Sequence, residues 1–338
     1  MRTHLVYSHL FDNHNCKGHP ENAERLHAMI KSFKESPLQR HIKIIEPSIL
    51  PEGLLYKVHS PDMIEQVKEM SDKEDKDESW IDLDTYVCRS DYETARLAAG
   101  GLLQLCREII DGTIDNGYAL IRPPGHHATR LRSMGFCLFN NAAIAAHYLT
   151  TRNKRVLIID HDVHHGNGTQ DIFYDRNDVM YQSFHLSPHY PGTGDHDEIG
   201  EGNGKGYTIN APLPYGSGDK AVTNILEEIM LPVAREFKPD FIIISAGYDS
   251  HHLDPLGGLK LTVNMYGEII KRYSIIQPRV ICTLEGGYNL EWIGKCMLSQ
   301  LGEMTSKPIQ IKDSANETAD ITPLISKIRK QLRDYWSI

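Results

Sequence analysis

Residues 156–168 read VLIIDHDVHHGNG, and this stretch decides the fold class. It opens with four apolar residues, a pattern typical of a strand that is buried on both faces in a parallel sheet. Acidic residues and histidines follow directly after the apolar run. Ligand sites of open parallel sheets gather at the carboxyl ends of the strands. The stretch therefore predicts an α/β fold with a functional site beyond the end of this strand.

Similar short apolar runs recur along the chain and alternate with segments of helical periodicity. Besides the strand at 156–159, strands are expected at 118–121, 179–184, 241–245 and 280–284. Helices are expected at 92–110, 140–150, 219–237 and 262–273. Ser90 and Glu93 form a capping-box pattern before the first helix, and Gly112 follows its end. The alternation predicts a single parallel multi-stranded sheet flanked by helices.

The length of 338 residues suits one large domain, and no internal repeat or clear boundary interrupts the pattern. We therefore predict a single domain over 1–338, with a core at about 18–300 and a polar tail at about 306–338. The tail is expected to end in an amphipathic helix near 325–335. Two segments are predicted to form loops, the charged residues 71–79 and the glycine-rich residues 188–206.

The net charge and the cysteines indicate which binding partners and which cellular compartment to expect. The formal net charge of −9 argues against a nucleic-acid-binding surface and is compatible with cationic substrates. Six cysteines without CxxC spacing indicate free thiols in a reducing compartment. No signal peptide and no run of membrane-spanning length is evident. We expect a cytoplasmic protein that binds neither nucleic acid nor membranes directly.

The residues after the first strand form a candidate metal site. Asp162 and His164 are two residues apart, so in an extended segment their side chains point the same way. Asp249 follows the strand expected at 241–245 and would supply a third ligand. Three protein ligands with an open position are typical of a catalytic zinc site. Taken alone, Asp249 is better explained as the cap of a turn, and only the combination favours a metal.

Two further motifs carry groups for proton transfer and oxyanion binding. His126 and His127 follow Pro-Pro-Gly, which disfavours a regular strand, so both side chains could line a pocket. Imidazoles exchange protons near neutral pH, as amide hydrolysis requires. Tyr288 follows two glycines that allow a sharp turn, and its phenol can donate a hydrogen bond to an oxyanion. Each motif by itself is also compatible with a packed loop.

Taken together, the motifs resemble the histone deacetylase and acetylpolyamine amidohydrolase superfamily, and its class II pattern in particular. The matching segments follow the family order: GHPENAERL (18–26), TYVCRSDYETARLAAGG (85–101), RPPGHHA (122–128), MGFCLFNNAAIAA (134–146), VLIIDHDVHHGNGTQ (156–170), HYPGTG (189–194), SAGYDSHHLDPLGG (245–258) and LEGGYN (284–289). The resemblance implies the arginase–deacetylase fold and one deacetylase catalytic domain. It also implies a zinc-dependent enzyme that removes acetyl or other acyl groups from lysine side chains and releases acetate and free amine.

The resemblance assigns roles to individual residues. The implied ligands of one Zn²⁺ are Asp162, His164 and Asp249. The implied catalytic residues are His126, His127, Tyr288, Asp160 and Asn167. The implied substrate-binding residues are Asp84, Gly135, Phe136, Tyr190 and Leu256. Structural K⁺ is implied around Asp160, Asp162, His164, Ser183 and Phe184.

The resemblance also implies which side chains contact one another. Asp160 would hydrogen-bond His126, and Asn167, where class I relatives carry aspartate, would contact His127. Which histidine is the base and which the acid stays open. Arg25 resembles an internal arginine near an acetate exit path. His161 departs from the family, whose members usually carry a bulky apolar or aromatic residue there, and strand alternation predicts that it points away from the metal.

Three alternative functions differ from this one in the residues that they require. A binuclear ureohydrolase of the same fold needs two more carboxylates, but Gly166 and His251 stand at those positions. An inactive binding module would have lost a ligand or Tyr288, and all are present. An acetylpolyamine deacetylase would carry a glutamate where this chain has Leu256. Acyl-lysine proteins or peptides are therefore the expected substrates, with small acyl-amines as the alternative.

Overall fold

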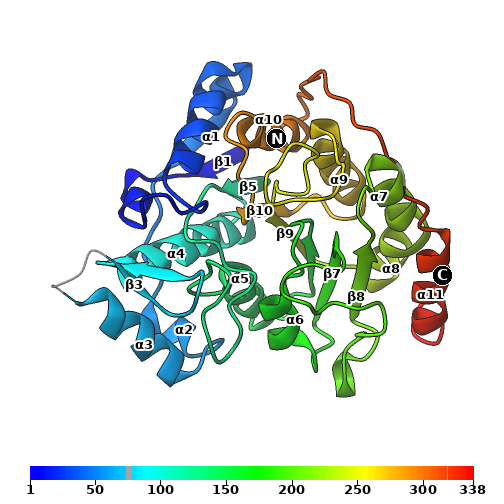
Figure 1. Cartoon of the computed structure of the whole chain (residues 1–338), viewed down its shortest axis with the longest axis horizontal. Helices are drawn as coiled ribbons and strands as arrows, with labels where there is room; N and C mark the ends of the chain where they lie inside the picture. The colour runs from blue at the N-terminus through cyan, green and yellow to red at the C-terminus, as the bar shows by residue number, and fades with distance from the viewer. Residues whose placement is uncertain (74–77, 318) are drawn as a thin grey trace.

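The computed structural model describes residues 1–73, 78–317 and 319–338, and its centre is an eight-stranded sheet (Figure 1). The strand order is β2-β1-β5-β10-β9-β6-β7-β8, and each neighbouring pair is parallel. The strands are β1 (Thr3–Val6), β2 (Ile42–Ile45), β5 (Asn116–Ala119), β6 (Val156–Asp160), β7 (Val179–Leu186), β8 (Thr208–Leu213), β9 (Phe241–Ala246) and β10 (Val280–Leu284). A separate antiparallel ribbon consists of β3 (Glu78–Trp80) and β4 (Tyr86–Cys88). The predicted α/β class with one parallel sheet is confirmed.

Helices cover both faces of this sheet (Figure 1). One face carries α4 (Asp91–Ile110), α5 (Asn141–Thr150) and α6 (Asn167–Phe173). The other face carries α1 (Glu24–Glu35), α10 (Ile293–Met304), α9 (Val263–Ile276) and α8 (Leu231–Phe237). The remaining helices are α2 (Glu52–Leu55), α3 (Pro61–Ser71), α7 (Asp219–Ile225) and α11 (Thr322–Leu332), the last of which packs at the β8 edge.

The two-sided cover explains why the central strands are apolar throughout. Every residue of β6, β9 and β10 is buried, as expected for strands between two helical layers. The register pairs Asp160 of β6 with Ser245 of β9 and with Ser183 of β7. These strands therefore end at the same level, and the loops that follow them meet at one edge of the sheet.

The start of α4 differs from the predicted capping box. Ser90 lies in the left-handed region with φ 67°, and its side chain caps nothing. The Tyr92 amide instead donates to Oγ of Ser71, at 2.9 Å. Ser71 was expected in an exposed loop at 71–79, but it is the buried last residue of α3. Of that predicted loop, residues 74–77 lie outside the described residues.

Other boundaries also differ from the predictions. The strand expected at 118–121 runs instead from Asn116 to Ala119. The helix expected at 219–237 is divided into α7 and α8 by a π-helical turn, Leu226–Met230. The turn precedes Pro232 at the start of α8, where a proline cannot donate to the preceding turn. Strands β1, β2 and β8 were not predicted, because they lie at or next to the edges of the sheet and contain polar residues or a proline.

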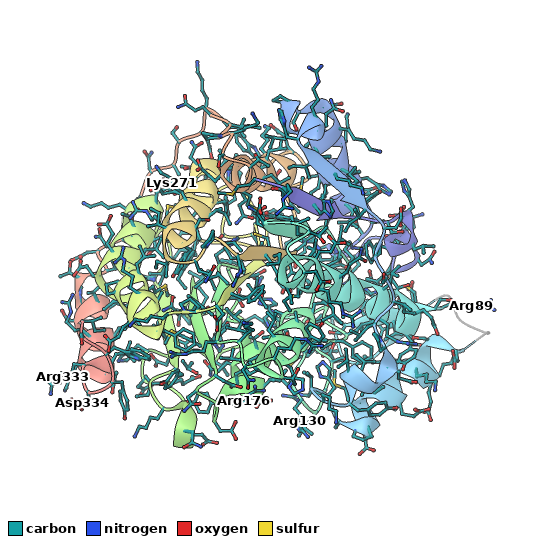
Figure 2. All side chains as sticks on the ribbon, turned by 180° about the vertical axis from the view of Figure 1, so that it is seen from behind. Arg89, Arg130, Arg176, Lys271, Arg333 and Asp334 are labelled. Carbon is teal, nitrogen blue, oxygen red and sulfur yellow. The ribbon has the colours of Figure 1, made fainter. Side chains whose placement is uncertain are left out.

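Charged side chains project from the periphery, as Figure 2 shows for Arg89, Lys271 and Arg333. All six cysteines are buried and unpaired. Among the described helices, none has the length and apolar character needed to cross a bilayer.

His59 anchors the loop that carries His126 and His127. Its buried ring places Nδ1 2.8 Å from the Thr129 carbonyl oxygen, and Nε2 accepts from the Asn140 amide at 2.9 Å. The neutral ring with its proton on Nδ1 satisfies both contacts. Burial lowers the pKa of His59 to about 4.

We expect His59 to make the protein less stable as pH falls from about 6.5 to about 4. In this window the unfolded chain binds a proton at His59 and the folded chain does not, so the free energy of unfolding should drop by about 3 kcal/mol. Above this window the His59 contribution is fully present. Urea unfolding of wild type and His59→Gln across this pH range should show their stability difference narrowing toward acid. If the stability difference between the two proteins stays constant over this pH range, the low pKa assigned to His59 is wrong.

Candidate active site

A cavity of about 240 Å³ lies where the loops after β5, β6, β9 and β10 meet. Its lining includes His126, His127, His164, Gly286 and Tyr288. The sequence predicted that these motifs follow strand ends, and the parallel register brings them to one edge of the sheet.

Asp162, His164 and Asp249 converge beside this cavity. Nδ1 of His164 lies 3.0 Å from Oδ1 of Asp162 and 3.3 Å from Oδ2 of Asp249. One ligand atom from each of the three residues lies within 4.8 Å of the others. Backbone amides fix the carboxylates, because Gly286 N donates to Asp162 Oδ2 and Val163 N to Asp249 Oδ1, both at 2.8 Å.

The surroundings of these three side chains fit a bound cation. Within the described residues, the buried Oδ2 of Asp249 receives no hydrogen bond. A Cβ at Gly286 would overlap the Oδ2 atoms of both Asp162 and Asp249, so glycine there keeps this space free. An Asp–His–Asp donor set suits Zn²⁺, which binds imidazole nitrogen and carboxylate oxygen.

The electrostatics of the three side chains agree with this fit. Burial lowers the pKa of His164, but Asp162 and Asp249 outweigh burial and raise that pKa to about 10. Burial and the charge of Asp162 raise the pKa of Asp249 to about 7. Both shifts have one origin, two buried carboxylates that face a single imidazole, and such an arrangement favours a cation between them.

His126 and His127 lie side by side with ring centroids 4.0 Å apart. Nδ1 of His126 lies 3.0 Å from Oδ2 of Asp160, and Nδ1 of His127 lies 2.8 Å from Oδ1 of Asn167. The predicted partners are thus in contact. Burial lowers the pKa of His126, but Asp160 and Asp162 outweigh it and raise that pKa to about 10. Burial and the charges of His126 and His164 lower the pKa of His127 well below its usual value.

Glu285 holds the loop of these histidines, a role that the sequence did not reveal. Its buried carboxylate accepts from the Gly125 amide at 2.7 Å, the His126 amide at 3.1 Å and the Ser245 hydroxyl at 3.0 Å. Burial raises its pKa to about 7. Glu285 belongs to the motif LEGGYN (284–289), from which only Tyr288 was predicted to be catalytic. Its contacts with the loop after β5 arise because β5 pairs with β10 in the sheet.

The backbone of Tyr288 is also fixed from two sides. Asp254 Oδ2 accepts from the amides of Tyr288 and Asn289 at 2.7 and 3.0 Å. The guanidinium of Arg25 lies 5.0 Å from the centroid of the Tyr288 ring, and its Nε donates to the Gly287 carbonyl at 2.6 Å. Tyr288 therefore presents its ring to the cavity from a rigid turn.

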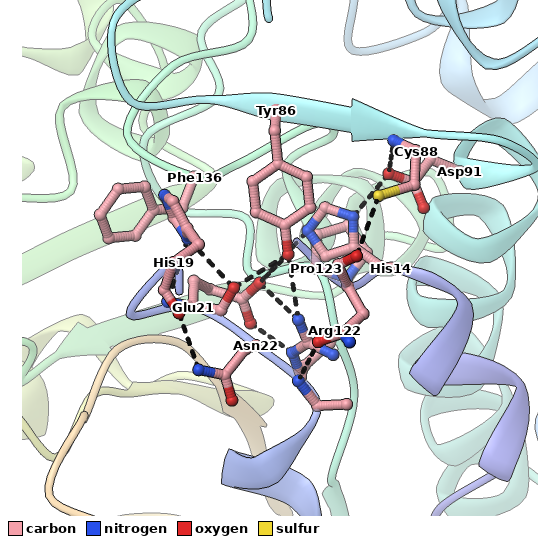
Figure 3. A network of polar contacts seen from close by, with 12 residues as sticks. His14, His19, Glu21, Asn22, Tyr86, Cys88, Asp91, Arg122, Pro123 and Phe136 are labelled. Atoms are coloured by element: carbon pink, nitrogen blue, oxygen red, sulfur yellow. Dashed lines mark hydrogen bonds and ion pairs between the residues drawn. The ribbon is translucent and has the colours of Figure 1, made fainter. Parts of the chain in front are cut away.

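Arg25 belongs to a buried network centred on Glu21. Figure 3 shows Glu21 in this network with His14, Tyr86 and Arg122. Glu21 accepts from Arg25 Nη1 at 2.9 Å and from Arg122 Nη2 at 2.7 Å. Nε of Arg122 also contacts Glu21. The Tyr86 hydroxyl donates to the Glu21 carbonyl at 2.9 Å, and His14 Nε2 lies 3.2 Å from its carboxylate. The network joins the N-terminal loop, β4 and the start of the histidine loop, and no local pattern predicted it.

A family model described as the histone deacetylase domain matches residues 19–304. The chain belongs to the histone deacetylase family. It is 38% identical over 300 residues to a probable deacetylase of Archaeoglobus fulgidus, covering 86% of this chain and 82% of the relative. It is 38% identical over 341 residues to a probable deacetylase of Methanothermobacter thermautotrophicus, covering 98% of each.

Solved structures agree with this assignment. The crystal structure of the HDA15 HD domain is similar with a TM-score of 0.91 and 33% identity, over 99% of this chain and 95% of that chain. The arginase–deacetylase fold is thereby confirmed, and family membership identifies the chain as a deacetylase, a hydrolase. The histone deacetylase family is zinc-dependent, and the Asp162–His164–Asp249 group meets the requirement for such a site.

The predicted substrate-binding residues of this histone deacetylase family member all line the cavity: Asp84, Gly135, Phe136, Tyr190 and Leu256. Gly135 has φ 56°, and a Cβ there would collide with the ring of His127. Sequence reasoning missed His189, whose ring stacks on His164 at 4.9 Å and whose Nε2 lies 3.3 Å from the Leu256 carbonyl oxygen. From the motif HYPGTG (189–194), only the neighbouring Tyr190 was predicted to bind substrate.

His161 points away from the cavity, as strand alternation predicts. Its buried Nδ1 lies 2.8 Å from the Gly247 carbonyl oxygen, and Nε2 faces the Gln300 amide nitrogen at 2.9 Å. Its ring packs beside Tyr248 and Tyr266. The residue thus fills the layer behind the loop that carries the candidate ligands Asp162 and His164.

Replacing Asp249 with Ala should remove tightly bound zinc while leaving a folded protein, because one of three ligands is lost and a costly buried carboxylate goes with it. Metal content after dialysis measures the loss of zinc, and the far-ultraviolet circular dichroism spectrum measures whether the fold is retained. Asp254→Asn is the matched control, since Asp254 sits on the same loop but faces the Tyr288 backbone. Stoichiometric zinc in Asp249→Ala would rule out this ligand set.

Proposed function

We propose that the chain is a zinc-dependent amidohydrolase that removes acetyl or other acyl groups from lysine side chains of proteins or peptides. The observation that carries the proposal is the Asp–His–Asp group at a narrow cavity, next to two imidazoles whose pKa values are pushed apart. Two neighbouring titratable groups whose pKa values differ in this way suit the roles of general acid and general base. Asp162, His164 and Asp249 would hold the Zn²⁺. When bound, the ion would polarise the acyl oxygen and acidify a water molecule.

We assign the base to His127. Its Nδ1 proton is donated to Oδ1 of Asn167, so the Nε2 lone pair stays free to accept a proton from water. Asn167 carries no charge, and its hydrogen bond favours the imidazolium form less than burial and the charges of His126 and His164 disfavour it. The low pKa of His127, which burial and the charges on His126 and His164 produce, keeps the ring neutral before the reaction.

We assign proton donation to His126. Oδ2 of Asp160 accepts from its Nδ1 and favours the charged ring, and the Tyr181 hydroxyl donates to the same Oδ2 atom at 3.0 Å. A protonated imidazole can donate to the departing amine from Nε2. The two histidines differ in role because one faces a carboxylate and the other an amide.

Phe136, Tyr190 and Leu256 would form the walls and rim around the acyl-lysine stem. Aromatic and aliphatic walls match the methylene stem of lysine, which carries no charge once its amine is acylated. Asp84 at the same cavity would accept hydrogen bonds from the substrate backbone. The same residues admit small acyl-amines, so acetylpolyamine deacetylation is the second candidate function.

Two finer assignments complete the proposal. A structural K⁺ would bind among Asp160, Asp162, His164, Ser183 and Phe184, because β6 and β7 pair here and backbone carbonyls are suitable K⁺ ligands. Six unpaired cysteines support a reducing compartment, and we propose the cytoplasm.

Tyr288→Phe should lower kcat by about two to three orders of magnitude, the usual cost of losing one oxyanion donor. The KM and the zinc content should change little, because the ring and its backbone contacts remain. Steady-state turnover of an acetyl-lysine peptide with parallel metal analysis measures all three. Turnover near that of wild type would place the tyrosine hydroxyl outside the reaction.

Leu256→Glu should shift substrate preference toward polyamines. A carboxylate at the rim would compensate the desolvation of a distant ammonium, which Leu256 leaves uncompensated. The readout is the ratio of kcat/KM for an acetyl-lysine peptide to that for N8-acetylspermidine, with wild type favouring the peptide. Leu256→Gln, of equal size but uncharged, is the control. A wild-type preference for the polyamine would overturn the lysine assignment.

A further inference from the structure

The C-terminal segment after α10 is bound to the loop that follows Asp249. This segment lies beyond residue 304, where the match to the family domain ends. In Figure 1 it runs from α10 past α9 and α7 to α11 at the edge of the molecule. Asp313 makes the central contact, and its side chain is only 3% exposed.

Asp313 uses both carboxylate oxygens. Oδ2 lies 3.0 Å from Nε2 of His251 and accepts from the Val263 amide at 2.8 Å. Oδ1 lies 2.8 Å from Nε2 of His252. The carboxylate therefore ties the loop after β9 to the first residue of α9.

The hydrogen bonds argue against a second metal centre at this cluster. The Leu253 amide donates to Nδ1 of His251 at 3.3 Å, so the proton of a neutral His251 ring is on Nε2. That Nε2 then donates to Asp313, whereas a metal would need its lone pair. Each polar atom of the His251 and Asp313 side chains has a partner, unlike Oδ2 of Asp249 at the zinc site.

The loop held by Asp313 leads directly to the backbone of Tyr288. The His251 carbonyl accepts from the Asp254 amide at 2.9 Å, and the Asp254 carboxylate accepts from the Tyr288 amide at 2.7 Å. The His251 ring also stacks on Trp292 with centroids 4.9 Å apart. Loosening His251 would therefore loosen the turn that presents the tyrosine.

We propose that Asp313 is a positioning residue for the deacetylase site, acting through His251 and Asp254 on the backbone of Tyr288. The proposal rests on the proposed function, since the deacetylation rate is one of its readouts. It extends the functional unit into a segment that the family domain does not include. A merely stabilising tail would affect stability without altering the turn around Tyr288.

Glu317 offers a matched control in the same segment. Its carboxylate accepts from the amides of Lys220 and Ala221 at 2.9 and 2.7 Å, at the start of α7. Neither it nor these partners lines the cavity of the candidate site. Removing Glu317 therefore weakens the attachment of the C-terminal segment without touching the loop of Asp254.

The test compares wild type, Asp313→Ala, Asp313→Asn and Glu317→Ala. Asp313→Ala should lower kcat on an acetyl-lysine peptide by roughly tenfold or more, because misplaced catalytic groups are costly, while KM changes much less. Asp313→Asn retains one acceptor oxygen, so its kcat should lie between those of wild type and Asp313→Ala. Glu317→Ala should keep the wild-type kcat. Zinc should stay at one equivalent in all four proteins.

Hydrogen exchange separates positioning from general loosening. Asp313→Ala should speed amide exchange in residues 250–257 and 286–290, whereas Glu317→Ala should speed it only near the start of α7. Unchanged exchange in 250–257, equal loss of kcat in both alanine variants, or a second zinc equivalent that Asp313→Ala removes would overturn the proposal. If wild type does not turn over the peptide, the proposed function fails, and exchange still decides the role of Asp313. If Asp313→Ala does not fold, Asp313→Asn carries the comparison.

Discussion

Two buried carboxylates that face one imidazole, Asp162 and Asp249 around His164, impose the constraint on which the rest of the site depends. Burying carboxylates is costly unless each oxygen finds a partner. Backbone amides of Gly286 and Val163 supply part of that compensation, so the loops after β6, β9 and β10 must adopt mutually compatible conformations. Oδ2 of Asp249, which receives no hydrogen bond from the described residues, is where a cation would complete the arrangement.

A second layer of buried polar groups holds these loops in place. Glu285 gathers the backbone of the histidine loop, while Glu21 joins Arg25 and Arg122 beneath it. Such groups add little net stability, because their desolvation offsets their attraction. Their contribution is to fix geometry, which is what a preorganised active site requires. The different partners of His126 and His127 likewise support the proposed division of these two identical side chains into a proton donor and a base.

In the proposed function, substrate selection would depend on a separate set of side chains that line the cavity. Leu256 at the rim, with Phe136 and Tyr190, gives an apolar approach to the metal group. His189 connects the two loops of the rim by stacking on His164 and contacting the Leu256 carbonyl. In the proposed function the chemistry and the choice of substrate would be carried by different residues, although His189 stacks on His164 and so connects the rim to the candidate metal group.

The sequence by itself determined the strand at 156–159, the helices near 92–110, 140–150 and 262–273, and the candidate metal set. These features depend on neighbours a few residues apart, such as the two-residue spacing of Asp162 and His164, and on motifs that resemble a known family. Tertiary structure alone decided that Ser71 caps α4 in place of Ser90, that Glu285 holds the histidine loop, and that Asp313 reaches His251. Each of these contacts joins residues 21 to 160 positions apart, and only the folded sheet brings them within hydrogen-bonding distance.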